Sequence, residues 1–176
     1  MIWLARHGET AYNAERRFQG QGAVPLSERG REQARELAEQ AAAHDFTSLW
    51  ASPLPRALET AEIVGARLGL EIAEDPRLME TDAGDWTDRP FAEVEAAEPE
   101  RFAGFVAGAP DFAFPGGESF AAQQDRVTAA LADIRAAGPL PALVVCHRNS
   151  IRLALERAQG RRLSLDDVPN GALVAL

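Results

Sequence analysis

Cysteine is nearly absent from this 176-residue sequence, in which Cys146 is the single example. One cysteine excludes an internal disulfide framework and a four-cysteine metal site. Basic residues are outnumbered as well, because 18 lysines and arginines face 27 aspartates and glutamates, for a net charge of −9. Nucleic acids and anionic membranes bind cationic surfaces, so neither is expected as the main partner.

Hydrophobic runs are short throughout the chain. No stretch approaches the roughly 18 consecutive apolar residues of a membrane span. The opening residues MIWLARHG lack the basic and long apolar segments of a signal peptide, which predicts a cytoplasmic location. The length suits a sizeable core, and neither repeats nor a linker interrupt it, so we predict a single domain over residues 1–176.

Short apolar segments alternate with amphipathic segments along the chain. Strands are expected at residues 2–5, 47–51, 142–146 and 172–176. Helices are expected from the N-cap Ser27 to about 41, after 51 up to a stop at Gly69, over 120–137 and over 151–158. This alternation predicts a three-layer α/β/α fold with a mostly parallel central sheet and helices on both faces.

Residues 86–117 break the alternation, because they are rich in proline, glycine, phenylalanine and glutamate. We predict an irregular excursion that covers a pocket. Seven of the twelve aromatic residues fall in 86–120, namely Trp86, Phe91, Phe102, Phe105, Phe112, Phe114 and Phe120. Most of these rings are expected to pack against the domain, and any that face the pocket would favour a bulky or partly apolar substrate group.

Two arginines and two histidines closely follow predicted strands. Arg6 and His7 follow the first strand, Arg56 follows the second, and His147 follows the strand at 142–146. Open α/β sheets bind ligands at the carboxyl ends of their strands. The segments that carry Arg56 and His147 lead into helices, whose N-terminal N–H groups favour anions. This convergence predicts a phosphate pocket.

The segment LVVCHRNSIR, residues 143–152, also supports a second chemistry. Cys146 and Arg152 have the Cys-x5-Arg spacing of phosphatases that use a cysteine nucleophile. Such a phosphate loop usually needs a glycine, and none lies between the two residues. Cys146 ends an apolar strand, where burial raises the pKa of a thiol, and Arg152 is expected at the surface of the next helix. We therefore favour His147 as the working residue of this segment.

Six stretches follow one another along the chain: ARHGETAYN (5–13), RFQGQGAVPLSERG (17–30), ASPLPRALETA (51–61), RLMETDAGDW (77–86), PGGESF (115–120) and VVCHRNSIR (144–152). Together they resemble the histidine phosphatase superfamily, also called the phosphoglycerate mutase-like family. The chain most resembles its compact members, the α-ribazole phosphatase-like and broad-specificity phosphatases. The resemblance implies a phosphomonoesterase that acts on a small phosphorylated metabolite and needs no metal or other cofactor.

The resemblance also implies roles for individual residues. His7 would take the phosphoryl group as a phosphohistidine, and Arg6, Arg56 and His147 would bind the phosphate oxygens. Glu80 matches the general acid that protonates the leaving oxygen and later activates water. The candidate substrate-binding residues are Asn13, Gln19, Gly20 and Arg148.

These residue types suit the reaction. A phosphate monoester is dianionic, so fixed cations offset the repulsion felt by a nucleophile and stabilise the transition state. A neutral imidazole is a good nucleophile near pH 7, whereas His147 is expected to be held cationic by phosphate. Glu80 must be protonated when the leaving group departs, and a neighbouring anionic substrate favours that form. The other acids that could lie near the site are Glu9, Asp82, Asp85 and Glu118.

Two departures from the resemblance leave the substrate open. Arg148 stands where the superfamily usually has glycine after the second histidine, and Thr87-Asp88 replaces a frequent Glu-Gly pair. Phosphoglycerate mutase-type transfer is the nearest alternative, although mutases usually carry a longer insertion between the acid and the second histidine. A non-catalytic phosphate-binding module is another, against which the intact catalytic set argues. The sequence also leaves a homodimer and the pathway open.

Overall fold

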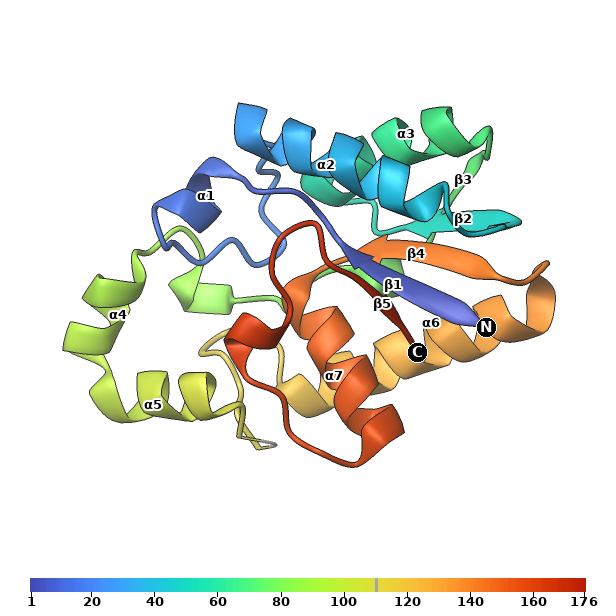
Figure 1. Cartoon of the computed structure of the whole chain (residues 1–176). Coiled ribbons are helices and arrows are strands. Elements are labelled where there is room, and N and C mark those ends of the chain that lie inside the picture. Colours follow the sequence, from blue (N-terminus) through green and yellow to red (C-terminus); the bar gives the residue numbers. More distant parts are fainter. Residues whose placement is uncertain (110) are drawn as a thin grey trace.

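Five strands form a sheet in the order β3-β2-β4-β1-β5 (Figure 1). The computed structural model describes residues 1–109 and 111–176. Four strands run parallel, and β5 pairs antiparallel with β1. Their bounds are β1 (Ile2–Arg6), β2 (Ser48–Ala51), β3 (Ile72–Glu74), β4 (Ala142–Cys146) and β5 (Leu173–Ala175). Arg6 pairs with Cys146 and Ala51 with Val145, so the carboxyl ends of β1, β2 and β4 meet at one edge.

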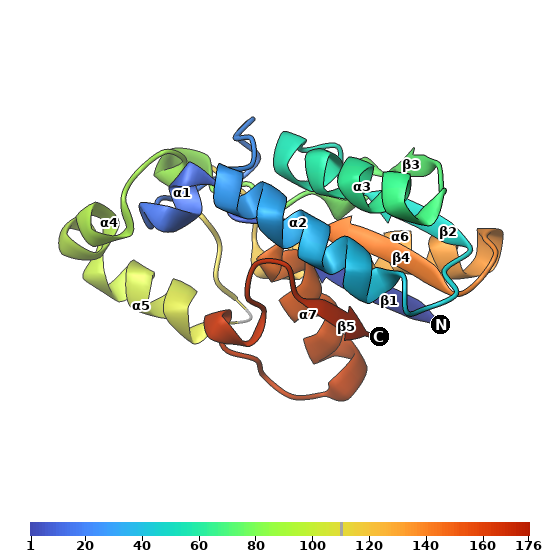
Figure 2. The same cartoon turned by 45° about the horizontal axis from the view of Figure 1, so that its top comes forward.

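Helices cover both faces of the sheet. On one face, α2 (Glu28–Ala41) and α3 (Pro55–Leu68) lie side by side (Figures 1 and 2). On the other face lie α6 (Phe120–Ala137) and α7 (Arg148–Gln159). The predicted three-layer α/β/α arrangement with a mostly parallel sheet is therefore confirmed.

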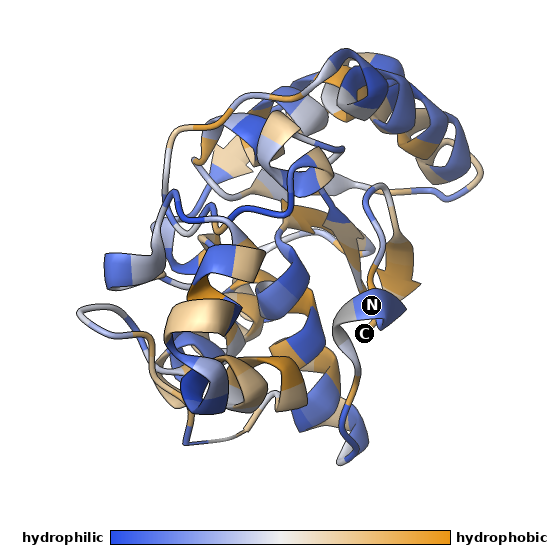
Figure 3. Cartoon of the chain, turned by 90° about the vertical axis from the view of Figure 1, so that its left-hand side faces the viewer, coloured by the Kyte–Doolittle hydropathy of each residue, from blue (hydrophilic) through white to orange (hydrophobic). Residues whose placement is uncertain are grey.

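Alternation of side chains along the strands explains the two cores. Leu4 and Val144 pack with the residues of α6 and α7, whereas Ala5 and Val145 pack with those of α2 and α3. Because successive residues of a strand point to opposite faces, two adjacent apolar residues serve two different cores. Figure 3 shows the result, with strands coloured mainly as hydrophobic between helices of mixed character.

The helix ends follow local chemistry. The Ser27 hydroxyl accepts a hydrogen bond from the Gly30 N–H at 3.0 Å and begins α2, as predicted. Gly69 ends α3 with a φ of +70°, which glycine adopts without strain. The last long helix was expected from residue 151 but begins at Arg148, because His147 is already its N-cap. Short elements that the sequence did not predict are α1 (Ala11–Ala14), β3 and the 3-10 turns Pro76–Leu78, Gly84–Trp86 and Leu165–Asp167.

The excursion at 86–117 is more regular than predicted. It contains two helices, α4 (Phe91–Ala97) and α5 (Pro99–Ala107), seen at the left of Figure 1. Pro90 precedes the first helix and Pro99 occupies the first position of the second. Proline fits there, since the first N–H groups of a helix have no partner inside it. Residue 110, within the predicted excursion, lies outside the described residues.

The aromatic side chains of the excursion form a third core, separate from those beside the sheet. Trp86 is fully buried, and its ring centre lies 5.5 to 6.5 Å from those of four phenylalanines. The Trp86 Nε1–H donates to Glu98 Oε1 at 3.0 Å, so its polar edge is satisfied. Phe18, far away in sequence, joins the cluster at 5.1 Å from Trp86. The prediction that most of these rings serve packing is confirmed.

Trp86→Ala is therefore expected to lower the free energy of unfolding by about 3 to 5 kcal/mol, since it removes the largest buried side chain of this core. Val106→Ala is the control, because Val106 is half exposed on α5. Denaturant unfolding measures the free energy of unfolding of both variants. It is followed by far-ultraviolet circular dichroism, because loss of a tryptophan alters a fluorescence signal. A loss below about 1 kcal/mol for Trp86→Ala would show that the aromatic core contributes little.

Candidate active site

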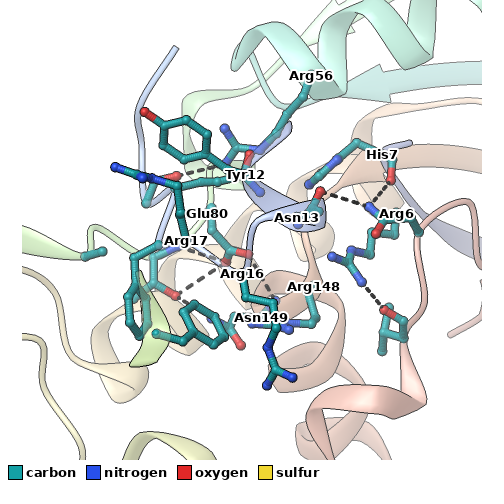
Figure 4. Close-up of a pocket in the computed structure, with 18 of the residues that line it drawn as sticks. Arg6, His7, Tyr12, Asn13, Arg16, Arg17, Arg56, Glu80, Arg148 and Asn149 are labelled. Atoms are coloured by element: carbon teal, nitrogen blue, oxygen red, sulfur yellow. Dashed lines mark hydrogen bonds between the residues drawn. The ribbon is translucent and has the colours of Figure 1, made fainter. Parts of the chain in front are cut away.

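The predicted site residues meet at the edge where β1, β2 and β4 end. A cavity of about 420 Å³ opens there (Figure 4). Predicted residues that line it are Arg6, His7, Asn13, Gln19, Gly20, Arg56, Glu80 and Arg148. The ring of His147 lies directly behind, with its centre 5.2 Å from that of His7. The sheet topology thus brings together residues that are up to 142 positions apart, from Arg6 to Arg148.

His7 is held with one ring nitrogen engaged and the other available. Its Nδ1 lies 2.6 Å from the Gly8 carbonyl oxygen, which can only accept, so Nδ1 carries the proton. The lone pair of the neutral ring is then on Nε2. Burial, followed by the charges of Arg56 and Arg6, lowers the pKa of His7 well below 6.5. The ring is therefore neutral at pH 7, the form in which an imidazole can act as a nucleophile.

The backbone around His7 is fixed from several sides. Its N–H donates to the Cys146 carbonyl at 3.1 Å, and its own carbonyl accepts from Asn170 Nδ2 at 3.0 Å. Gly8 follows and packs so tightly against Gly30 that a Cβ on Gly8 would lie 2.1 Å from the Gly30 oxygen. The glycine of the ARHGET segment is thus required by a close approach of two backbones.

Two arginines are buried beside His7. Arg6 Nη1 donates to the Val168 carbonyl at 2.6 Å, and Arg56 donates from Nη1 and Nη2 to Gly22 and Gly20 carbonyls at 3.0 and 2.8 Å. Burial lowers the pKa of Arg6 to about 9 and that of Arg56 to about 10, so both are cationic at neutral pH. Neutral carbonyls position these guanidinium groups without cancelling their charge, which leaves both available to an anion.

His147 is oriented by Ser52, a residue that the sequence did not single out. Its Nε2 lies 2.7 Å from Ser52 Oγ, and that oxygen already accepts the Leu54 N–H at 3.3 Å. When the serine hydroxyl donates to Nε2, the ring proton of neutral His147 lies on Nδ1. Nδ1 is buried and has no partner among the described residues. This N–H is a donor that a phosphate oxygen can complete.

The expectation that His147 is cationic concerns the phosphate-bound site and stays a prediction. Burial, with the charge of Arg56 next, lowers its pKa well below 6.5, so the ring is neutral in this environment. A cationic form would depend on the charge of a bound phosphate. A neutral Nδ1–H still donates a hydrogen bond, so the residue does not need a positive charge to bind an oxygen.

Glu80 reaches the cavity through a network of donors. Its Oε1 accepts from the Thr81 N–H at 2.9 Å and from Gln123 Nε2 at 3.1 Å. Its Oε2 has one long contact, 3.4 Å from the Asn149 N–H. Gln123 is fully buried on α6 and also hydrogen-bonds Thr81 and Ser150, so it cannot turn freely. The carboxyl group is therefore anchored through Oε1, while Oε2 is left for a reactant.

Glu80 is also distinguished from the other acids near the motifs. Glu9 accepts from Ser27, Asp82 accepts from the Gly84 N–H, and Glu118 pairs with Arg126 at 2.7 Å. Among the described acids, those that line the cavity are Glu80 and Asp166.

The remaining predicted residues play different parts. The Asn13 side-chain oxygen accepts from the Thr10 N–H at 3.1 Å and so caps α1 at the rim of the cavity. Gln19 Oε1 accepts from Thr10 Oγ1 at 2.9 Å. Gly20, with a φ of +50°, contributes the carbonyl that holds Arg56. The side chain of Arg148 lines the cavity. The resemblance led us to expect glycine at this position of the sequence.

Several lining residues escaped the sequence analysis. They include Tyr12, Arg16, Arg17, Phe18, Thr81, Asn149, Asp166 and Asn170. Phe91 and Phe105, which belong to the aromatic set of the excursion, also line the cavity. The backbone of Arg16 has a φ of +54°, which is uncommon for residues other than glycine and which its residue type does not predict.

The cysteine alternative does not fit this geometry. Cys146 is 1% exposed, and burial raises the pKa of its thiol to about 12. Arg152 was expected at the surface and is instead fully buried. Its Nη1 pairs with Glu156 at 3.1 Å, and its guanidinium lies 4.7 Å from the centre of the Phe120 ring. The ion pair and the aromatic face explain how a cation can be buried there.

Within residues 1–109 and 111–176, no three His, Cys, Asp or Glu side chains are grouped so that they could hold a metal ion. Over the same part of the chain, no helix combines the length and apolar content that crossing a membrane requires.

Known proteins share the sequence motifs and the fold of this chain. The histidine phosphatase superfamily (branch 1) matches residues 2–174. The chain is 42% identical over 132 residues to a probable phosphoglycerate mutase of Enterobacter sp. (strain 638), a match that covers 75% of this chain and 61% of the relative. The chain thus spans about three fifths of the length of that curated relative.

Solved structures share the fold. A mycobacterial glucosyl-3-phosphoglycerate phosphatase complexed with VO3 superposes with a TM-score of 0.87 at 30% identity, over 98% of this chain and 90% of that one. A candidate alpha-ribazole-5'-P phosphatase from Escherichia coli superposes with a TM-score of 0.80 at 27% identity, over 98% and 87%. Since the family match extends over nearly all of its length, the chain belongs to the histidine phosphatase superfamily.

Proposed function

We propose that this chain hydrolyses the phosphate monoester of a small metabolite through a phosphohistidine on His7, without a metal ion. The observation that carries the proposal is the orientation of the His7 ring. Its Nδ1–H is committed to the Gly8 carbonyl, so the Nε2 lone pair is available beside the buried cations Arg6 and Arg56. Fixed cations of this kind stabilise the charge of a phosphoryl-transfer transition state.

In the first step, His7 Nε2 attacks phosphorus and the bond from phosphorus to the ester oxygen breaks. Arg6, Arg56 and the Nδ1–H of His147 bind the non-bridging oxygens. The departing alkoxide takes a proton from Glu80. In the second step, water attacks the phosphohistidine while the Glu80 carboxylate accepts its proton, and inorganic phosphate leaves with His7 neutral again.

The hydrogen bonds of Glu80 indicate which oxygen carries this proton. Oε1 accepts from two N–H donors, which favours lone pairs on that oxygen. Oε2 has the 3.4 Å contact with the Asn149 N–H alone. The transferable proton therefore belongs on Oε2, and Gln123 acts as a positioning residue that keeps Oε1 turned away.

Glu80→Gln is expected to slow hydrolysis of alkyl phosphates by about 10²- to 10⁴-fold, because their alkoxides need a proton to leave. With p-nitrophenyl phosphate the first step needs no proton, so the variant should release one p-nitrophenolate per enzyme in a burst and then turn over slowly. Stopped-flow absorbance measures this. If Asp166→Asn gave the burst and Glu80→Gln did not, the assignment of the acid would be wrong.

The activity itself is tested by phosphate release from a panel of phosphorylated metabolites, with a chelator present throughout. We expect at least one ester to be hydrolysed with kcat/KM of about 10⁴ M⁻¹s⁻¹ or more. Vanadate binding without hydrolysis of any ester would favour a non-catalytic phosphate-binding module. Loss of activity on chelation would contradict the metal-independent mechanism.

Phosphoglycerate mutase-type transfer is the second candidate, favoured by the name of the Enterobacter relative. A mutase returns the phosphoryl group of the phosphohistidine to substrate, so water must be kept from it. The assay is interconversion of 2- and 3-phosphoglycerate after priming with bisphosphoglycerate. Isomerisation faster than phosphate release would establish the mutase, and phosphate release alone would establish the phosphatase.

A further inference from the structure

The cavity holds more positive charge than a single phosphate requires. Five arginines line it, namely Arg6, Arg16, Arg17, Arg56 and Arg148. Arg6 and Arg56 flank His7 and are assigned to the phosphate. Arg17 is compensated, because its Nη2 lies 3.5 Å from the Asp88 carboxylate and its Nη1 lies 3.8 Å from that of Glu15. Arg16 and Arg148 make no ion pair with any described residue.

Arg148 occupies an unfavourable position for a cation. It is the first residue of α7, where the helix dipole is positive and disfavours a positive side chain. Its Nε is buried and has no hydrogen-bond partner among the described residues. Burial lowers the pKa of Arg148, and its charge in turn contributes to lowering the pKa of Arg6. Each of these costs is offset by an anion bound at Arg148.

Arg16 lies at the mouth of the same cavity. Its guanidinium carbon is 6.0 Å from the centre of the Phe91 ring, and Phe91 itself lines the cavity. Its charge is among those that act on Arg148, so the two cations share one region. Figure 4 shows both side chains on the side of the cavity away from Arg56.

The acids in the lining do not balance this excess. The charges of Glu80 and Asp166 act to raise the pKa of Arg148, but neither acid forms an ion pair with Arg148 or Arg16 among the described residues, and Glu80 gives up its negative charge when it acts as the acid. A phosphate dianion compensates Arg6 and Arg56 and leaves Arg16 and Arg148. We propose that Arg148 and Arg16 form a second anion subsite, so that the substrate carries an oxyanion on its leaving group, with its body against Phe18, Phe91 and Phe105.

This inference rests on the proposed phosphatase activity and names its substrate class. A charged group reached by two guanidinium ions would be bound through charge-assisted hydrogen bonds. The aromatic rings would contact the body of the leaving group, and the two arginines would bind the charged group at its far end.

The test uses three aryl esters with one framework: 3-carboxyphenyl, 3-phosphonophenyl and 3-carbamoylphenyl phosphate. The carbamoyl ester is the neutral counterpart of the carboxylate. The wild type is expected to prefer an anionic ester over the carbamoyl ester in kcat/KM. Arg148→Gln and Arg16→Gln should each reduce that preference at least about 10-fold, the size expected for a hydrogen bond to a charged group. The carboxylate and phosphonate arms distinguish which oxyanion is preferred.

Arg157→Gln is the matched control, since Arg157 is exposed near the end of the same helix and the change removes the same charge. It should leave the preference unaltered. If the two cavity variants lowered kcat/KM equally for all three esters, the second subsite would be refuted while the phosphatase stands. If the wild type hydrolysed none of the three esters or of the metabolite panel, the proposed function itself would fail.

Discussion

His7→Ala is expected to lower kcat/KM for every phosphoester by at least about 10⁴-fold, because it removes the atom that forms the covalent intermediate. Neither His147 nor Cys146 is expected to take its place, since His147 is engaged by Ser52 and Cys146 is a buried thiol whose pKa is raised to about 12. Steady-state phosphate release, measured with the best ester of the panel, checks this.

Two controls separate this effect from damage to the fold. His44→Ala removes another histidine, whose ring centre lies 4.3 Å from that of Trp3 and which is not among the residues lining the cavity. It should keep kcat/KM within about 3-fold. Cys146→Ser should also retain turnover. The reverse pattern, with Cys146→Ser inactive and His7→Ala active, would restore the cysteine mechanism.

Arg56→Ala is expected to lower kcat/KM by roughly 10³-fold, since it removes a buried cation from the transition state. The pH dependence should change as well. Arg56 contributes, after burial, to the low pKa of His7, so its removal raises that pKa. As pH falls, His7 protonates sooner in the variant, and the acid limb of kcat/KM moves to higher pH.

The comparison is made between variants at each pH, because the ester itself has a pKa near 6. Arg67→Ala is the matched control, as Arg67 lies on the same helix and pairs with Glu39 at the surface. Arg56→Lys should recover little, because a lysine ammonium lacks the planar two-nitrogen fork with which Arg56 donates to the carbonyls of Gly22 and Gly20. An unchanged acid limb in Arg56→Ala would mean that this arginine does not tune His7.

The residues at strand ends were predictable because sheet geometry alone brings them together. His7 and His147 follow β1 and β4, which pair in parallel, so their proximity follows from two short apolar segments. Likewise, Ser27 and Gly69 bound helices through local chemistry that needs no tertiary contact. Each of these features is determined by a few consecutive residues.

Two errors concern features that depend on tertiary contacts, whereas a third has a local cause. Ser52 gains its role because β2 lies beside β4, and nothing in its neighbours marks it. Arg152 is buried because Glu156 and Phe120 receive it, the latter from another helix. Pro99 suggested irregular chain, yet it begins a helix because it falls at its first position.

The most direct test of the central claim is to trap the intermediate. The enzyme is mixed with a ³²P-labelled ester, quenched in alkali within milliseconds, digested and mapped. The account predicts an acid-labile, alkali-stable label on the peptide that contains His7, formed and lost fast enough to account for turnover, and absent from His7→Ala. A label on Cys146, or turnover without any label on His7, would contradict it.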